Sequence, residues 1–142
     1  MMTPTSRSLP TTRRPAPLHL ALRRSVEAPG IARTAAAEHC ERFGLDGSTC
    51  QTLLLLVSEL VSNAVLHSAA PPEAIITMTV AVGDEAISVT VTDAGDGFVP
   101  GQRDPARADG GYGLYLLERA ASRWGVESRG ATSVWFELPL SD

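Results

Sequence analysis

The chain contains no lysine, and all 12 of its basic residues are arginine. This absence excludes Schiff-base chemistry and the phosphate-binding lysine of P-loop proteins. Acidic residues number 16, which gives a formal net charge of −4 at pH 7. Nucleic acid is therefore not expected as a partner, because binding to a phosphate backbone requires a basic surface.

Cysteine is scarce, and long apolar runs are absent. Cys40 and Cys50 belong to no Cys-x-x-Cys pair and have no histidine cluster beside them. This pattern predicts two reduced thiols and a cytoplasmic location. The longest strongly apolar run, Leu53 to Val57, is far shorter than the roughly 18 residues that a membrane-spanning helix needs. Neither a signal peptide nor a membrane partner is expected.

The length of 142 residues fits one domain with a short extension. Residues 1–17 carry four prolines among serine, threonine and arginine, and they contain no acidic residue. Such a composition predicts a disordered tail. Residues 18–142 are then expected to form the folded domain.

Hydrophobic periodicity predicts three helices. Pro29 is a favourable first residue and Gly44 a favourable stop for an alanine-rich helix. The clearest helix follows, with Ser48 or Thr49 as its cap. A third is expected over residues 113–122. Apolar residues of the second helix recur every three or four positions, as a helix with one buried side requires: Leu53, Leu56, Val57, Leu60, Val61, Ala64 and Val65.

Alternating apolar residues predict strands over residues 18–23, 124–128 and 133–140. Residues 75–92 are expected to form an antiparallel hairpin around Gly83 and Asp84 as a two-residue turn. The stretch 93–113 has no period, and so long a loop is typical of a functional segment. The order of elements predicts an α/β two-layer (α+β) sandwich, with a mixed, mostly antiparallel sheet and helices on one face.

Glu59, Asn63 and His67 recur every four residues on the second helix. They form one polar row beside the apolar stripe, so they can face a pocket at the edge of the core. Taken alone, such a row is more often an ordinary polar helix surface.

Three glycine-containing segments follow. Asp93 ends a strand and is followed by Gly95 and Gly97, which would allow a ligand to approach the backbone closely. Gly111 and Gly113 precede Leu114 at a helix start, where free backbone N–H groups can bind an anion. Gly130 and Thr132 lie in the last turn. Each segment alone could be no more than a turn.

Together and in this order, the four segments resemble the GHKL superfamily of gyrase, chaperone, histidine-kinase and mismatch-repair ATPases. The chain is most similar to the small bacterial anti-sigma-factor serine/threonine kinases. The resemblance rests on the N-box Glu59–Ala64, the glycine boxes at 93–97 and 111–114, and the Thr132 segment, and covers residues 18–140.

The resemblance implies a role for each of these residues in binding ATP. Asp93 would bind the adenine amino group with support from Thr132, while Gly95 and Gly97 would let the adenine lie close to the backbone. Asn63 would bind Mg²⁺, for which an amide oxygen is a suitable ligand.

The remaining roles concern the phosphates and their transfer. Gly111, Gly113 and Leu114 would hold phosphate, and residues 98–110 would form a lid in which Arg103 or Arg107 could meet the γ-phosphate. Glu59 would be the general base.

No second helical domain or lysine-bearing domain fits in this length, so the resemblance implies a stand-alone regulator of transcription. Such a protein would phosphorylate a serine on an anti-anti-sigma (STAS-like) partner and could also bind a sigma factor. A homodimer is a further expectation, with the alanine-rich helix 31–43 either in its interface or covering the sheet. The alternative function is an ATP-gated binding module that sequesters its partner without kinase turnover. Glu59 favours the kinase, because a pure binding module needs no base there.

Overall fold

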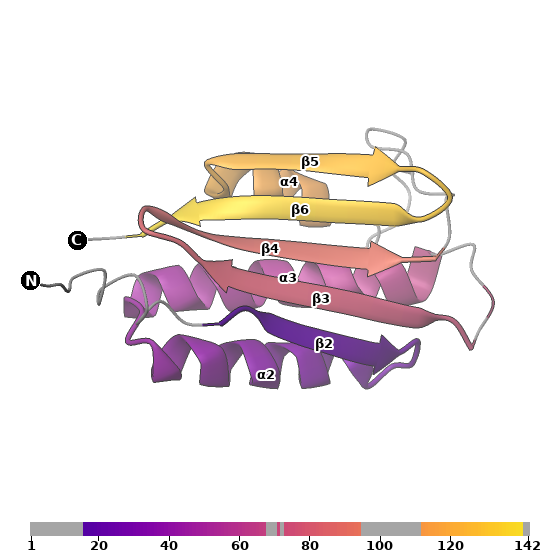
Figure 1. Ribbon diagram of the computed structural model, residues 1–142. Coiled ribbons are helices and arrows are strands. Elements are labelled where there is room, and N and C mark those ends of the chain that lie inside the picture. Colours follow the sequence, from indigo (N-terminus) through magenta and orange to yellow (C-terminus); the bar gives the residue numbers. More distant parts are fainter. Residues whose placement is uncertain (1–15, 68–70, 72, 95–111, 141–142) are drawn as a thin grey trace, which may run out of the picture.

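The computed structural model describes residues 16–67, 71, 73–94 and 112–140 (Figure 1). Five strands and three helices lie in this part of the chain. In sequence order they are β2 (Leu18–Arg23), α2 (Ala28–Arg42), α3 (Gly47–His67), β3 (Ile75–Val82), β4 (Ala86–Asp93), α4 (Tyr112–Ala120), β5 (Arg123–Ser128) and β6 (Thr132–Pro139).

The strands form one sheet in the order β2-β3-β4-β6-β5, and the three helices cover one of its faces (Figure 1). This arrangement confirms the predicted α+β sandwich. Every pair of neighbouring strands is antiparallel, so the sheet formed by the described residues is not mixed. Because β4 pairs with β6, the chain between them leaves the sheet, forms α4 on the helical face and returns at the edge as β5.

Helix α3 lies in the middle of the helical layer, between α2 and α4 (Figure 1). Its length and apolar composition would allow it to cross a membrane. Its apolar side instead packs on the sheet: Leu53, Leu56 and Val57 are fully buried against residues such as Met78 and Phe136. The predicted periodicity of this helix is thus the signature of a core helix.

The alanine stripe of α2 faces the interior of the same chain. Ala28, Ala32 and Ala36 are at most 1% exposed, because small side chains let α2 approach β2 and α3 closely. Of the two expectations for this helix, packing within the fold is the one that the structure supports. The stripe cannot also contact a second copy, although a homodimer through another surface stays a prediction.

Two turns differ from their predictions. The cap of α3 is Asp46 rather than Ser48 or Thr49, since its Oδ2 accepts hydrogen bonds from the backbone N–H groups of both residues at 3.1 Å. The β3–β4 turn is shifted by one residue: Val82 pairs with Ile87 and the N–H of Gly83 donates to the carbonyl of Ala86, so Asp84 and Glu85, rather than Gly83 and Asp84, are its two central residues. Two turns in the described part of the chain favour glycine through a left-handed backbone: Gly44 after α2, as predicted for the helix stop, has a φ of +63°, and Gly130 before β6 has a φ of +77°.

Candidate functional site

One hydrogen bond shows which flank of α3 faces α2 and which faces away from it. Arg33 of α2 donates from Nη1 to the hydroxyl of Ser58 at 2.9 Å, so Ser58 faces α2. Each residue of a helix is turned by about 100° from the one before. Glu59 and Asn63 are therefore turned away from α2, toward the flank occupied by α4.

Glu59 and Asn63 are one helical turn apart, and both are half-buried. Neither side chain has a hydrogen-bond or ion-pair partner within the described part of the chain. Half-buried polar groups are normally satisfied by a protein partner, water or a ligand. Among the described residues, this carboxylate and this amide on one flank of one helix are therefore available to a ligand.

Asp93 and Thr132, which are 39 positions apart, are brought together as a pair in the sheet. Asp93 is the last residue of β4, Thr132 is the first of β6, and the two are directly opposite in the antiparallel register. The neighbouring pair, Thr92 and Ser133, is joined by a hydroxyl–hydroxyl hydrogen bond of 2.8 Å on the other face of the sheet. Alternation then places Asp93 and Thr132 on the helical face. Thr132 is only 2% exposed there.

These two pairs of residues belong to the same end of the molecule. In Figure 1, β4 ends, β6 begins and α3 ends on the right-hand side. Helix α3 contacts both β4 and β6 as well as α4. Gly113 and Leu114 are in the first turn of α4, as predicted, where backbone N–H groups have no partner within the helix. The structure thus brings the end of α3, the end of β4 and the beginning of β6 to the same side of the molecule, and α4 packs beside α3.

Some predicted residues lie outside the described part of the chain. These are Gly95, Gly97 and Gly111 together with the lid 98–110, which includes Arg103 and Arg107. His67 is the last residue of α3.

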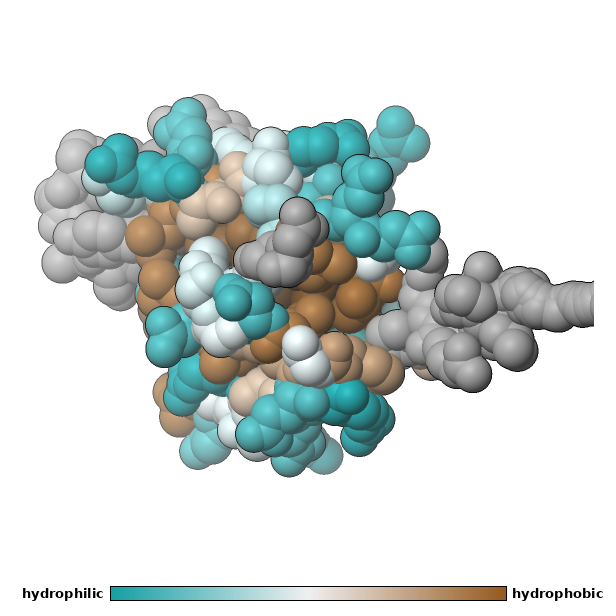
Figure 2. Space-filling view, turned by 90° about the vertical axis from the view of Figure 1, so that its left-hand side faces the viewer, coloured by the Kyte–Doolittle hydropathy of each residue, from teal (hydrophilic) through white to brown (hydrophobic). Residues whose placement is uncertain are grey.

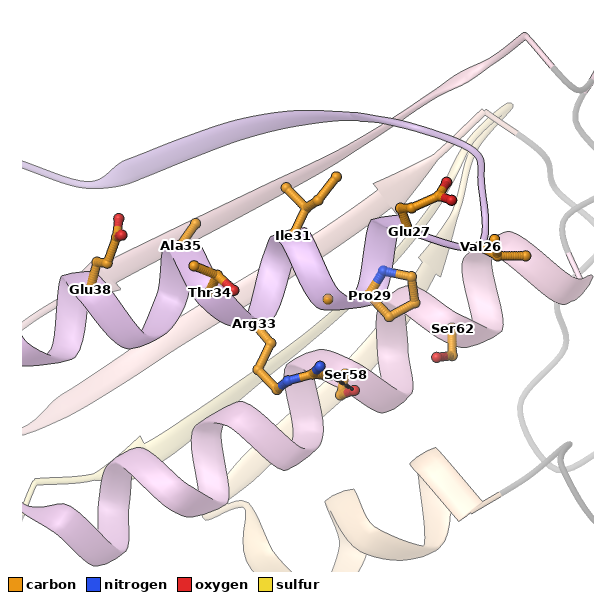
Figure 3. A pocket seen from close by; sticks show the side chains of 11 residues that line it. Val26, Glu27, Pro29, Ile31, Arg33, Thr34, Ala35, Glu38, Ser58 and Ser62 are labelled. Atoms are coloured by element: carbon orange, nitrogen blue, oxygen red, sulfur yellow. Dashed lines mark hydrogen bonds between the residues drawn. The ribbon is translucent and has the colours of Figure 1, made fainter.

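A separate hollow of about 960 Å³ lies on the opposite flank of α3 (Figure 3). Residues of α2, among them Pro29, Ile31 and Arg33, line it together with Ser58 and Ser62. None of the predicted site residues lines it. In Figure 3 the Arg33 side chain reaches from α2 to Ser58 across this hollow. Sequence reasoning missed this surface, because its residues come from two helices and carry no common motif.

The donor set at the Glu59–Asn63 flank fits a hard divalent cation. Asn63 offers one amide oxygen, and Glu59 one carboxylate one turn away. Within the described ranges, no group of three or more histidine, cysteine, aspartate or glutamate side chains could hold a metal by itself. Mg²⁺ is commonly bound by one or two protein oxygens together with substrate phosphates and water, so a single amide ligand suits Mg²⁺ in a nucleotide complex.

A family profile for the histidine kinase-like ATPase domain matches residues 22–137. The match covers most of the chain and includes both α3 and the Asp93–Thr132 pair. The chain belongs to the histidine kinase-like ATPase domain family. Membership in this ATPase family implies ATP binding and supports an ATP-dependent, kinase-like chemistry. No curated protein sequence matches the chain.

Solved structures agree with the family's fold. The RsbU and RsbW domains of Rv1364c from Mycobacterium tuberculosis match with a TM-score of 0.73 and 24% identity, over 90% of this chain and 33% of that chain. At this identity the likeness shows the fold, and this chain spans a third of the other's length. The histidine kinase domain of the blue-light activated kinase EL346 from Erythrobacter litoralis matches with a TM-score of 0.52 and 26% identity, over 65% and 45% of the two chains.

Proposed function

We propose that this ATPase-family domain is a Mg-ATP-dependent protein serine/threonine kinase of the anti-sigma-factor type. Its substrate would be a serine on an anti-anti-sigma (STAS-like) protein, and a sigma factor would be a second partner in the cytoplasm. The observation that carries the proposal is the pair Glu59 and Asn63, which have no side-chain partner among the described residues, on a helix that packs on the two strands in which Asp93 and Thr132 pair. The likeness to a structure containing an RsbW domain supports the anti-sigma type.

Asp93 and Thr132 would recognise the adenine. A carboxylate can accept a hydrogen bond from the exocyclic amino group of adenine, whereas guanine presents a carbonyl at the same position. Thr132 is buried beside Asp93, so its hydroxyl can support this contact directly or through water. The pair would therefore select ATP over GTP.

Asn63 and the start of α4 would bind the phosphate end of the nucleotide. Bound Mg²⁺ neutralises phosphate charge and so lowers the barrier to phosphoryl transfer. The amide oxygen of Asn63 would hold and orient that ion. The free N–H groups of the first turn of α4, at Gly113 and Leu114, would bind phosphate oxygens.

Glu59 would accept the proton of the attacking serine hydroxyl. The serine oxygen then bonds to the γ-phosphorus, the bond from the γ-phosphorus to the bridging oxygen breaks, and ADP leaves with that oxygen. A positioned general base typically accelerates such a step by about 10²- to 10⁴-fold. A module that only binds ATP would gain nothing from a carboxylate at Glu59.

Transfer of labelled γ-phosphate to a partner tests the proposal. The partner is captured from the source cell on the wild-type chain with and without ATP, and transfer is then followed in a single turnover. We expect Glu59→Gln to slow transfer by about 10²- to 10⁴-fold while ATP affinity is retained. Ser62→Ala, a change on the α2 side of the same helix, serves as the matched control and should transfer at the wild-type rate.

Two results would contradict the assignment. Equal transfer rates in Glu59→Gln and the wild type would show that Glu59 is not the base. Absence of transfer by the wild type to any partner captured in an ATP-dependent manner would instead favour the ATP-gated binding module.

A further inference from the structure

The turn between α2 and α3 brings the two cysteines of the chain together. Cys40 lies in the last turn of α2 and Cys50 in the first turn of α3. Leu45 in the turn bonds to both residues: its N–H donates to the carbonyl of Cys40 at 3.1 Å, and its carbonyl accepts from the Cys50 thiol at 3.8 Å. Cys50 is also the neighbouring side chain that acts on the Cys40 thiol.

The two thiols differ in their access to solvent. Cys40 is 3% exposed and belongs to the hydrophobic core, whereas Cys50 is half-buried and packs against the edge of that core. The turn between α2 and α3 is at the left-hand end of Figure 1, whereas β4 ends and β6 begins at the right-hand end. Figure 2 faces the left-hand end and shows apolar surface between polar margins. A small oxidant arriving from solvent would therefore reach Cys50 first.

We propose that Cys40 and Cys50 are a site of reversible oxidative modification, at which a hydroperoxide converts the two thiols into an intramolecular disulfide. In the first step the sulfur of Cys50 takes an oxygen atom from the hydroperoxide, which leaves as an alcohol or, for hydrogen peroxide, as water. In the second step the sulfur of Cys40 attacks the sulfenic acid at Cys50, the S–O bond breaks, and water leaves with the thiol proton.

The second step should be the slower one. Burial and the neighbouring Cys50 thiol raise the pKa of Cys40 to about 12, so little thiolate is present at neutral pH. The disulfide should consequently form more quickly as the pH rises. This property distinguishes the pair from a fast peroxide sensor, whose attacking thiol has a low pKa.

The expected consequence of the bridge is greater stability rather than loss of ATP binding. The bridge closes a loop of only eleven residues and ties the end of α2 to the start of α3. Glu59 and Asn63 lie about 14 and 20 Å further along the helix axis at 1.5 Å per residue. From the usual effect of closing such a loop, we expect the oxidised protein to melt about 5–10 °C higher than the reduced one.

Peptide mapping of the full chain gives a direct test. The reduced wild-type protein is treated with hydrogen peroxide well below its melting temperature and digested with trypsin without a reductant. Because Arg42 separates the cysteines and no arginine occurs between it and Arg103, the thiols fall in different peptides, 34–42 and 43–103. We expect these peptides to be linked, with the loss of two hydrogen atoms, and to separate when dithiothreitol is added.

Two variants serve as controls. Cys40→Ser should leave Cys50 as a sulfenic acid that dimedone traps, while Cys50→Ser should show neither dimedone labelling nor the rise in melting temperature. Peptides that stay unlinked in oxidised, folded wild-type protein would overturn the proposal. Exclusive formation of an intermolecular Cys50–Cys50 bridge would also overturn it. The outcome does not depend on whether the chain transfers phosphate.

Discussion

The two flanks of α3 differ in how the fold uses their polar groups. On the α2 flank, Ser58 accepts a hydrogen bond from Arg33, and the carbonyl of Val65 accepts one from Arg24 Nε at 3.1 Å. On the α4 flank, Glu59 and Asn63 have no such partner within the described residues. Polar groups on one flank therefore bind α3 to neighbouring segments of the chain, while Glu59 and Asn63 on the other are, among the described residues, available to a ligand.

Because of this difference, we expect residues on the α2 flank of α3 to affect mainly stability and residues on its α4 flank to affect mainly function. Ala32 and Ala36 let α2 pack closely, and substitutions there should lower the free energy of unfolding without touching the nucleotide. Substitutions on the α4 flank or at the adjoining sheet end should change nucleotide binding or transfer with little effect on folding. Variants on the two flanks can be compared as matched pairs.

Asp93→Asn should have the largest effect on nucleotide affinity. Loss of a hydrogen bond from the adenine amino group to a charged acceptor costs about 1.5–3 kcal/mol, which corresponds to roughly a ten- to hundredfold weaker Kd for ATP. Calorimetric titration would measure it, with GTP expected to bind poorly to the wild type. The control is Asp84→Asn, an exposed aspartate in the β3–β4 turn. An unchanged Kd in Asp93→Asn would remove this residue from adenine recognition.

Ala32→Leu, on the α2 flank, should lower the free energy of unfolding and leave ATP affinity unchanged. Ala32 is 0% exposed, so the larger side chain overpacks the interior and should cost about 1–3 kcal/mol of the free energy of unfolding. Urea denaturation would measure this loss. Thr34→Leu, on the exposed side of α2, should be close to neutral. A folded Ala32→Leu protein that binds ATP much more weakly would show that the two flanks are not independent.

His39 of α2 should make a smaller, pH-dependent contribution to the free energy of unfolding. It is 6% exposed, its Nε2 has no hydrogen-bond partner within the described residues, and its ring packs edge-to-face on Phe43. Burial, and then the charge of Arg42, lower the pKa of His39 below its ordinary value of 6.5.

The folded state therefore favours the neutral imidazole. Its contribution to the free energy of unfolding should be complete above pH 6.5 and should fall as the pH drops through 6.5 toward the lower folded-state pKa. His39→Gln should flatten the stability profile as the pH falls through 6.5, because the extra proton uptake of the unfolded state at this residue is removed. The exposed His19→Gln variant is the control. An identical pH dependence in His39→Gln and the wild type would rule out this contribution.

Much of the fold could be predicted because its elements have local signals. The apolar residues of α3 and the alternation in β3, β4 and β6 depend only on residues near in sequence. The capping of α3 was assigned wrongly because Asp46, Ser48 and Thr49 are all good capping residues, and only the backbone geometry shows which oxygen accepts the bonds. The predicted position of the β3–β4 turn was wrong for a related reason, since the position depends on the pairing of the two strands as well as on the turn residues.

The candidate site could be predicted only in part. Glu59 and Asn63 follow from helical spacing, but the direction in which they face is set by α2, which packs on the other flank. No local pattern pairs Asp93 with Thr132, because that contact depends on the long-range register of β4 with β6. The hollow lined by α2 and α3 arises from packing alone and has no sequence signature.

Titration of Mg-ATP into two neighbouring variants would test the difference between the flanks most directly. Asn63→Ala removes the amide proposed to hold the metal. Ser62→Ala changes the preceding residue, which lies on the α2 flank. Both substitutions introduce the same side chain into α3, so effects on helix stability should be small and similar. We predict a roughly tenfold or greater loss of Mg-ATP affinity in Asn63→Ala, with wild-type affinity in Ser62→Ala. Equal affinities in the two variants, or a loss confined to Ser62→Ala, would contradict the assignment of the α4 flank as the nucleotide site.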